Sequence, residues 1–125
     1  MNIGFLGCGN IAQAMIVGLL DSGLNPTSIT VLTRNQKKKK FFKKNSIKSL
    51  AVSKANSAKF DFIFLCVKPK DVKDAIEGSK INWENTTLVS VVAGISSQEL
   101  KVFSNSEKVI RIMPTTSAEF GKSIT

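Results

Sequence analysis

Short apolar runs alternate along the chain with longer segments in which apolar residues recur at helical spacing. The runs that predict strands are Asn2–Leu6, Ile29–Thr33, Ile47–Val52, Phe60–Val67, Leu88–Ala93 and Val109–Met113. Phe60–Val67 is almost continuously apolar, which is typical of a central parallel strand buried on both faces. Because strands and helices take turns, the pattern predicts a doubly wound α/β fold, a parallel sheet with helices on both faces.

The segments between these strands predict the helices. They are Asn10 to about Ser22, Gln36–Lys44, one or two turns in Lys54–Lys59, Pro69 to about Gly78, and a segment capped by Ser96 or Ser97 that continues through Phe103. Gly23 and Asn25-Pro26 end the first helix and open a loop. The chain of 125 residues contains no internal repeat and no linker, so we expect one domain spanning residues 1–125.

The first strand runs directly into a Gly-x-Gly-x-x-Ala sequence formed by Gly7, Gly9 and Ala12, and an amphipathic helix follows. A strand before this pattern and a helix after it are typical of a Rossmann-type dinucleotide-binding fold. Gly7 permits the tight turn, Gly9 leaves room for a pyrophosphate, and Ala12 lets the helix pack closely on the strand. The helix N-terminus would then meet the phosphates with its N–H groups. The alternative is a glycine-rich turn without a ligand.

The end of the second strand favours NADP(H) over NAD(H). Folds that prefer NAD place a carboxylate there to bind the ribose 2′-hydroxyl, but the sequence after Val31-Leu32 is Thr33-Arg34-Asn35, with no acidic residue until Asp61. Arg34 and the nearby lysines would attract a 2′-phosphate, which an arginine can bind with two hydrogen bonds. Arg34 could otherwise be an ordinary surface residue, and NAD(H) stays the alternative cofactor.

The net charge of +9 is concentrated in one segment, because six of the 18 basic residues lie between Lys37 and Lys44. The simplest interpretation is a solvated helix with Phe41 and Phe42 partly turned into the core. The alternatives are a patch that binds nucleic acid or an acidic membrane, and a patch that attracts a phosphate-bearing cofactor. No nucleic-acid-binding motif accompanies the segment, and no apolar run reaches the roughly 18 residues of a membrane span, so neither partner is expected.

Two residue types are missing, since the chain contains no His and no Tyr. Oxidoreductases that depend on a tyrosine or histidine as general acid are therefore excluded. Metal-ligand and paired-carboxylate spacings are absent as well. Cys8 and Cys66 follow strands that are neighbours in the usual sheet order. We interpret them as small packing residues rather than a redox pair, which fits a reducing cytoplasm.

Several of these segments also carry a family resemblance. They are Gly4–Ala12, Thr33–Asn35, Cys66–Val72, Ser90–Ser96 and Val109–Thr116. In these segments, and most specifically in Val67-Lys68-Pro69 and Met113-Pro114, the chain resembles the N-terminal half of the pyrroline-5-carboxylate reductase family. Thr115 stands where the family has Asn, and Ser117 stands where it has a second Pro.

The resemblance implies a role for each matching position. The pyrophosphate would be wrapped by Leu6, Gly7, Cys8, Gly9, Asn10 and Ile11. The 2′-phosphate would be held by Thr33, Arg34 and Asn35, with Asn56 near the adenosine ribose. The nicotinamide and its ribose would be bordered by Val67, Lys68, Pro69, Ala93 and Gly94. The face where substrate meets cofactor would be lined by Met113, Pro114 and Thr115. Lys68 and Thr115 are the candidate catalytic residues, although Lys68 is equally well interpreted as a solvated lysine at a strand end.

The implied activity is the NADPH-dependent reduction of 1-pyrroline-5-carboxylate, a cyclic imine acid, to L-proline. This chain would be the cofactor-binding half, because the family's helical dimerisation domain has no counterpart here. We therefore expect a mostly monomeric chain, and a homo-oligomer only where that domain is present. The alternatives are a non-catalytic NADP(H)-binding module and a related NADP-dependent imine or deazaflavin-linked oxidoreductase.

Overall fold

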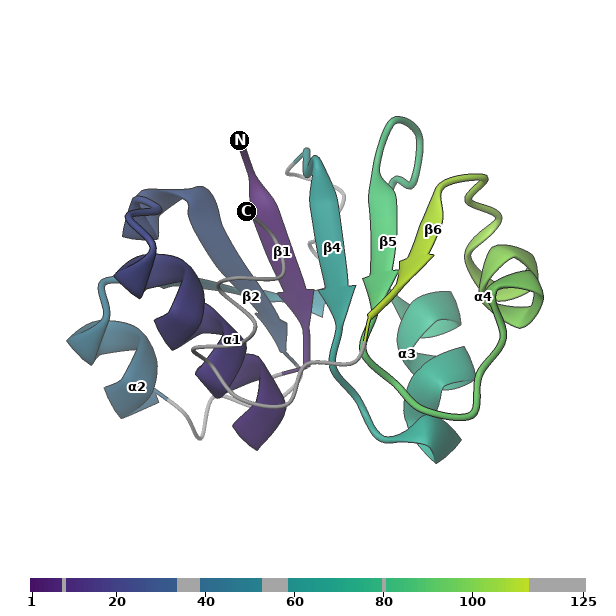
Figure 1. The fold of residues 1–125 in the computed structure, drawn as a ribbon, viewed down its shortest axis with the longest axis horizontal. Helices are drawn as coiled ribbons and strands as arrows, with labels where there is room; N and C mark the ends of the chain where they lie inside the picture. The colour runs from purple at the N-terminus through teal and green to yellow at the C-terminus, as the bar shows by residue number, and fades with distance from the viewer. Residues whose placement is uncertain (8, 34–38, 53–58, 80, 113–125) are drawn as a thin grey trace.

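Six parallel strands form a single twisted sheet in the order β3-β2-β1-β4-β5-β6 (Figure 1). This computed structural model describes residues 1–7, 9–33, 39–52, 59–79 and 81–112, without the side chains of residues 39–41. The strands are β1 (Ile3–Leu6), β2 (Ile29–Thr33), β3 (Lys48–Ala51), β4 (Phe62–Leu65), β5 (Thr87–Ser90) and β6 (Val109–Arg111). The order changes direction at β1, which pairs with β2 on one side and β4 on the other.

Helices cover both faces of the sheet. They are α1 (Asn10–Asp21), α2 (Lys39–Lys44), α3 (Val72–Gly78) and α4 (Ser97–Ser104), with one-turn 3₁₀ helices η1 (Pro26–Ser28) and η3 (Pro69–Asp71). Residues of α1 and α2 pack in one apolar cluster with one face of the sheet. Residues of α3 and α4 pack in a second cluster with the other face. The structure therefore confirms the predicted doubly wound α/β fold.

The centre of the sheet is buried on both faces, as continuous apolar strands require. All four residues of β1 are buried. Phe5 of β1 stacks on Phe64 of β4, with ring centroids 5.0 Å apart and planes inclined by 13°. On the other face, Leu65 packs in the same cluster as Val72 and Ile76 of α3. Helices therefore pack on both faces of β1 and β4, and this packing fixes where the two strands end relative to the helices.

Local signals in the sequence set most element boundaries. Gly23 has φ +104° just after α1, a backbone angle that glycine adopts without strain. Ser96 caps α4 in a capping box: its hydroxyl accepts from the N–H of Glu99 at 3.1 Å, and the Glu99 carboxylate accepts from the Ser96 N–H at 3.3 Å. Asn105 ends this helix with φ +58°. The predicted range of β2 and the start of α1 match the structure.

The largest differences in strand length concern β4 and β5. The expected strand Phe60–Val67 contains β4 only over Phe62–Leu65, and Leu88–Ala93 overlaps β5 (Thr87–Ser90) over Leu88–Ser90. The apolar residues beyond these ladders are buried for other reasons: Phe60 packs with the second cluster, and so does Val92. The predicted helix from Pro69 is two elements, η3 followed by α3. The expected helical turns near Lys54 lie mostly outside the described residues.

The outer strands are short and carry exposed basic residues. Lys48 begins β3 and Arg111 ends β6, and both side chains are exposed. Phe42 of α2 is buried, while Lys43 and Lys44 are exposed, as expected for a solvated basic helix. None of the described helices is long and apolar enough to cross a membrane.

The stacked ring pair in the centre of the sheet gives a test of this core. Phe5→Ala is expected to lower the free energy of unfolding by about 3–5 kcal/mol, because Phe5 is fully buried and its removal leaves a cavity. Val102→Ala is the matched control, since Val102 is 70% exposed on α4 and should change stability by less than about 0.5 kcal/mol. Urea unfolding followed by circular dichroism measures both. A cost below about 1 kcal/mol for Phe5→Ala would contradict this packing.

Candidate dinucleotide-binding site

The carboxyl ends of the six strands meet at one edge of the sheet, and α1 and α3 both begin there (Figure 1). Ligands bind at this edge in open parallel α/β sheets, beside the point where the strand order reverses. That point is the end of β1. Backbone hydrogen bonds hold the chain in register past it: the Gly7 N–H donates to the Leu32 carbonyl at 3.2 Å, and the Cys66 N–H donates to the Leu6 carbonyl at 3.0 Å.

Gly7 sits where β1 leaves the sheet, and no other residue fits there. Its φ of +97° belongs to the left-handed region. A Cβ atom on Gly7 would lie 2.9 Å from the Cys66 carbonyl oxygen and 2.9 Å from Cγ1 of Val67. The glycine is therefore needed for two reasons. It makes the tight turn, and it lets the end of β1 lie close to the chain after β4.

Gly9 has the opposite surroundings. Its φ of −87° is open to every residue type, and a Cβ atom built on it would meet no atom of the described residues within 4 Å. It is the N-cap of α1, with no side-chain capping hydrogen bond and no acidic residue in the first turn of this 12-residue helix. The described residues therefore leave the positive end of the helix open, which is the arrangement that binds phosphate.

A cavity of about 340 Å³ lies over the ends of the strands and reaches Gly7, two residues before the N-cap of α1. It is lined by Leu6, Gly7, Leu32, Thr33, Val52, Val67, Asp71, Asp74 and Ala75. Most of these side chains are apolar. They come from β1, β2 and β4 or from the residues just after these strands, and from η3 and α3. Four of the predicted site residues, Leu6, Gly7, Thr33 and Val67, thus border one cavity.

The other described site residues lie around the same sheet edge without lining this cavity. Gly9, Asn10 and Ile11 form the exposed start of α1. Lys68 and Pro69 follow β4 and are exposed, and Lys68 is the N-cap of η3. Ala93 and Gly94 form an exposed turn after β5.

The buried Ser90 side chain supports this last turn. Its hydroxyl accepts a hydrogen bond from the Val92 N–H at 3.2 Å, directly after β5. Several predicted residues lie outside the described residues: Cys8, Arg34, Asn35, Asn56, Met113, Pro114 and Thr115. Their roles stay predictions.

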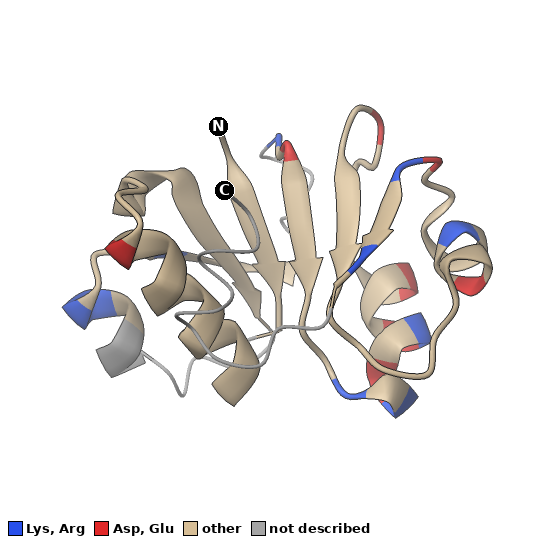
Figure 2. Ribbon diagram, viewed as in Figure 1, with Lys and Arg blue, Asp and Glu red and all other residues tan. Residues whose placement is uncertain are grey.

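Five residues that line the cavity were not predicted as site residues: Leu32, Val52, Asp71, Asp74 and Ala75. Asp71 and Asp74, the two charged ones, lie at the start of α3, three residues apart and so on one side of the helix. Figure 2 shows acidic residues on α3, and basic residues at its start as well. The available signal was the spacing Asp-x-x-Asp that begins two residues after Pro69, because helix starts at this sheet edge face the ligand site.

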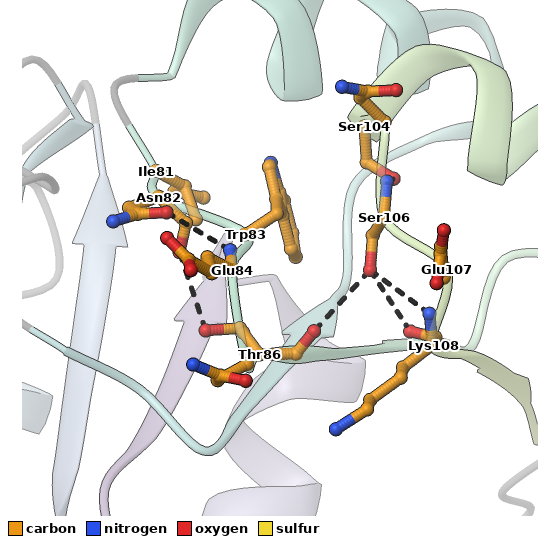
Figure 3. Close-up of a pocket in the computed structure, with 11 residues that line it drawn as sticks. Ile81, Asn82, Trp83, Glu84, Thr86, Ser104, Ser106, Glu107 and Lys108 are labelled. Atoms are coloured by element: carbon orange, nitrogen blue, oxygen red, sulfur yellow. Dashed lines mark hydrogen bonds between the residues drawn. The ribbon is translucent and has the colours of Figure 1, made fainter.

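A second cavity, of about 590 Å³, opens at the amino-terminal edge of β5 and β6 (Figure 3). Its central polar groups bind one another. The Ser106 hydroxyl lies 3.4 Å from the Thr86 carbonyl oxygen and accepts from the Lys108 N–H at 3.3 Å, while the Thr86 hydroxyl donates to the Phe60 carbonyl at 2.7 Å. These contacts join two loops. Among the described residues no group of three or more His, Cys, Asp or Glu could hold a metal ion.

Residues 2–94 match the family described as NADP oxidoreductase, coenzyme F420-dependent. The chain therefore belongs to this family of NADP-linked oxidoreductases. The matched range contains the glycine loop, β2, η3 and α3.

Within that class, the curated relatives are pyrroline-5-carboxylate reductases. The enzyme of Haemophilus influenzae is 33% identical over 122 residues, covering 96% of this chain and 45% of its own. The Arabidopsis thaliana enzyme is 32% identical over 124 residues, with the same two coverages. The solved structure of the Coxiella burnetii reductase matches with a TM-score of 0.78 and 26% identity, over 94% of this chain and 46% of its own. This chain spans about half the length of these relatives.

The two glycines give a paired test of the site. Gly9→Val should keep the melting temperature within a few degrees, because the space around Gly9 is open, and should abolish NADPH binding by filling the space of the phosphates. Gly7→Ala should instead destabilise the fold by at least about 1–2 kcal/mol, from its positive φ alone. Thermal unfolding and calorimetric titration measure the two effects. Normal NADPH binding by Gly9→Val would place the phosphates elsewhere.

Proposed function

We propose that this chain binds NADP(H) at the carboxyl edge of its sheet and is the cofactor-binding half of a pyrroline-5-carboxylate reductase. The observation that carries this proposal is the open, uncapped start of α1 at Gly9 beside the cavity at the strand ends. A pyrophosphate needs backbone N–H groups and room to approach them, and this helix end offers both. Residues 1–125 would then form the dinucleotide-binding domain, as the sequence predicts.

The fit to a dinucleotide extends along the cavity. Thr33 ends β2 and lines it, at the position where such folds contact the adenosine ribose. Bound NADPH would supply the hydride. The residues of this chain would bind and orient it, and the exposed Lys68, Ala93 and Gly94 would border its nicotinamide end.

The proposed substrate is 1-pyrroline-5-carboxylate, the cyclic imine acid that the relatives' name specifies. Reduction of a C=N bond suits a chain without His or Tyr, because the imine nitrogen can arrive protonated and the protein then mainly positions the reactants. Lys68 and Thr115 remain the candidate catalytic residues. The chain would act without nucleic acid or membrane and would be mostly monomeric as 125 residues.

A second candidate function is NADP(H) binding without turnover. It is favoured by the exposure of Lys68, Pro69, Ala93 and Gly94, the described residues proposed for the nicotinamide end. These residues give one side of a reaction site. A substrate held from that side alone would lack the positioning on which a fast hydride transfer depends.

The choice of cofactor is tested at the end of β2. The unmutated chain should bind NADPH more tightly than NADH, and Arg34→Glu should reduce this preference about tenfold or more, the effect of losing one charge-assisted hydrogen bond. Calorimetric titration at modest salt measures both cofactors. Lys108→Glu is the control: it makes the same charge change just before β6, at the opposite edge of the sheet. Equal affinities for NADH and NADPH in the unmutated chain would refute the preference.

Catalysis is tested separately from binding. We expect the 125-residue chain to bind NADPH yet to turn over little or no 1-pyrroline-5-carboxylate, because positioning of two reactants can account for up to about 7–11 kcal/mol of a barrier. NADPH oxidation is measured beside a full-length pyrroline-5-carboxylate reductase at equal concentration. Turnover by the short chain near that of the full-length enzyme would show that Lys68 and residues 113–116 suffice.

A further inference from the structure

The cavity at the strand ends has apolar walls and one acidic corner. Leu6, Leu32, Val52, Val67 and Ala75 supply the apolar side chains, and Asp71 and Asp74 supply the carboxylates. The acidic corner lies at α3, whereas the uncapped helix end that suits phosphate lies at α1. A ligand that spans both therefore needs an anionic group at one end and a flat apolar group with hydrogen-bond donors at the other.

Asp71 is placed to accept a hydrogen bond from such a donor. It is the N-cap of α3, and its backbone N–H donates to the Lys68 carbonyl at 2.9 Å, which fixes the turn before the helix. Its side chain makes no capping hydrogen bond, although aspartate is among the residues that cap helices best. Asp71 instead lines the cavity and is exposed, so its carboxylate is open to a ligand. An ionised carboxylate only accepts hydrogen bonds.

Adenine is the group in a dinucleotide that matches this corner. Its two faces are apolar enough to lie between aliphatic side chains, and its exocyclic amino group at C6 presents N–H donors at the edge of the ring. Hypoxanthine has the same shape but carries an oxygen acceptor at C6, which would face the carboxylate with lone pairs. The uncapped start of α1 would hold the phosphates, so the base would lie at the α3 end of the site.

We propose that Asp71 is a specificity-determining residue that accepts a hydrogen bond from the exocyclic amino group of adenine, so that the site selects 6-aminopurine dinucleotides over 6-oxopurine dinucleotides. The inference rests on the proposed binding of NADP(H) and adds that the cavity binds the adenine end of the cofactor. Asp74, one turn further along the same side of α3, adds negative charge to the corner. A purely structural Asp71 would stabilise the start of α3 and leave base selection unaffected.

The test compares NADPH with its analogue in which hypoxanthine replaces adenine, by calorimetric titration of the full chain. The unmutated chain should bind the analogue about tenfold or more weakly, the effect of one hydrogen bond to a charged group. In Asp71→Asn the side-chain amide can donate to the C6 oxygen, so the ratio of the two affinities should fall to about twofold or less. Asn caps helices as well as Asp does, so this variant should keep the melting temperature.

Two further variants separate base selection from charge and from folding. Glu77→Gln removes a negative charge from α3 at an exposed position outside the cavity lining, and it should keep the unmutated ratio. Asp71→Ser keeps a good helix cap without the carboxylate and should also lose the discrimination. Equal binding of the two nucleotides by the unmutated chain would overturn the proposal, while NADPH binding itself would still support the proposed function.

Three other results would also decide against Asp71. If Asp71→Asn strengthened both nucleotides by the same factor, the carboxylate would act by charge alone and the base-reading role would be wrong. If neither nucleotide bound to the unmutated, folded chain, the proposed dinucleotide site and this inference would fail together. If Asp71→Asn kept the unmutated ratio of the two affinities and the same stability, the adenine would be bound by another part of the site.

Discussion

The close approach of β1 to the chain after β4 is the constraint on which the site depends. The Cys66 N–H donates to the Leu6 carbonyl at 3.0 Å, and Gly7 then turns away with its α-carbon too near the Cys66 carbonyl for any side chain. Since β1 also pairs with β2, the end of β1 is held from both sides. The start of α1 is therefore held over the strand ends, and none of the described residues fills the space where a Gly9 side chain would lie.

Most of the fold could be predicted from the sequence because its signals are local. The short apolar runs identified β1 and β2, and of the two serines predicted to cap α4, Ser96 and Ser97, the structure has Ser96 as the cap. The ends of β4 and β5 could not be predicted, because Phe60 and Val92 are as buried as strand residues while lying outside the hydrogen-bonded ladder. The apolar pattern reports which residues are buried, whereas the bounds of a strand depend on its hydrogen bonds with a neighbouring strand.

The candidate site was predictable where it depends on backbone and not where it depends on tertiary placement. The roles of Gly7 and Gly9 could be predicted, because both belong to a known motif in which each glycine acts through the local backbone. Asp71 and Asp74 have no such motif. They enter the cavity because η3 turns the chain after Pro69, and because α3 packs its apolar side, with Val72 and Ile76, against the second cluster. Two helix starts thus border one set of strand ends: α1 has no acidic residue in its first turn, whereas Asp71 and Asp74 lie at the start of α3.

The short outer strands have a consequence for how copies of this chain meet in a concentrated solution. Parallel edges leave N–H and C=O groups that can pair with any other exposed strand, which is how sheets extend into aggregates. Here one edge strand begins with the exposed Lys48 and the other ends with the exposed Arg111. Edge pairing between two copies would bring like charges together and would gain only three or four residues of ladder. The positive charge on the two outer strands therefore disfavours assembly through the sheet.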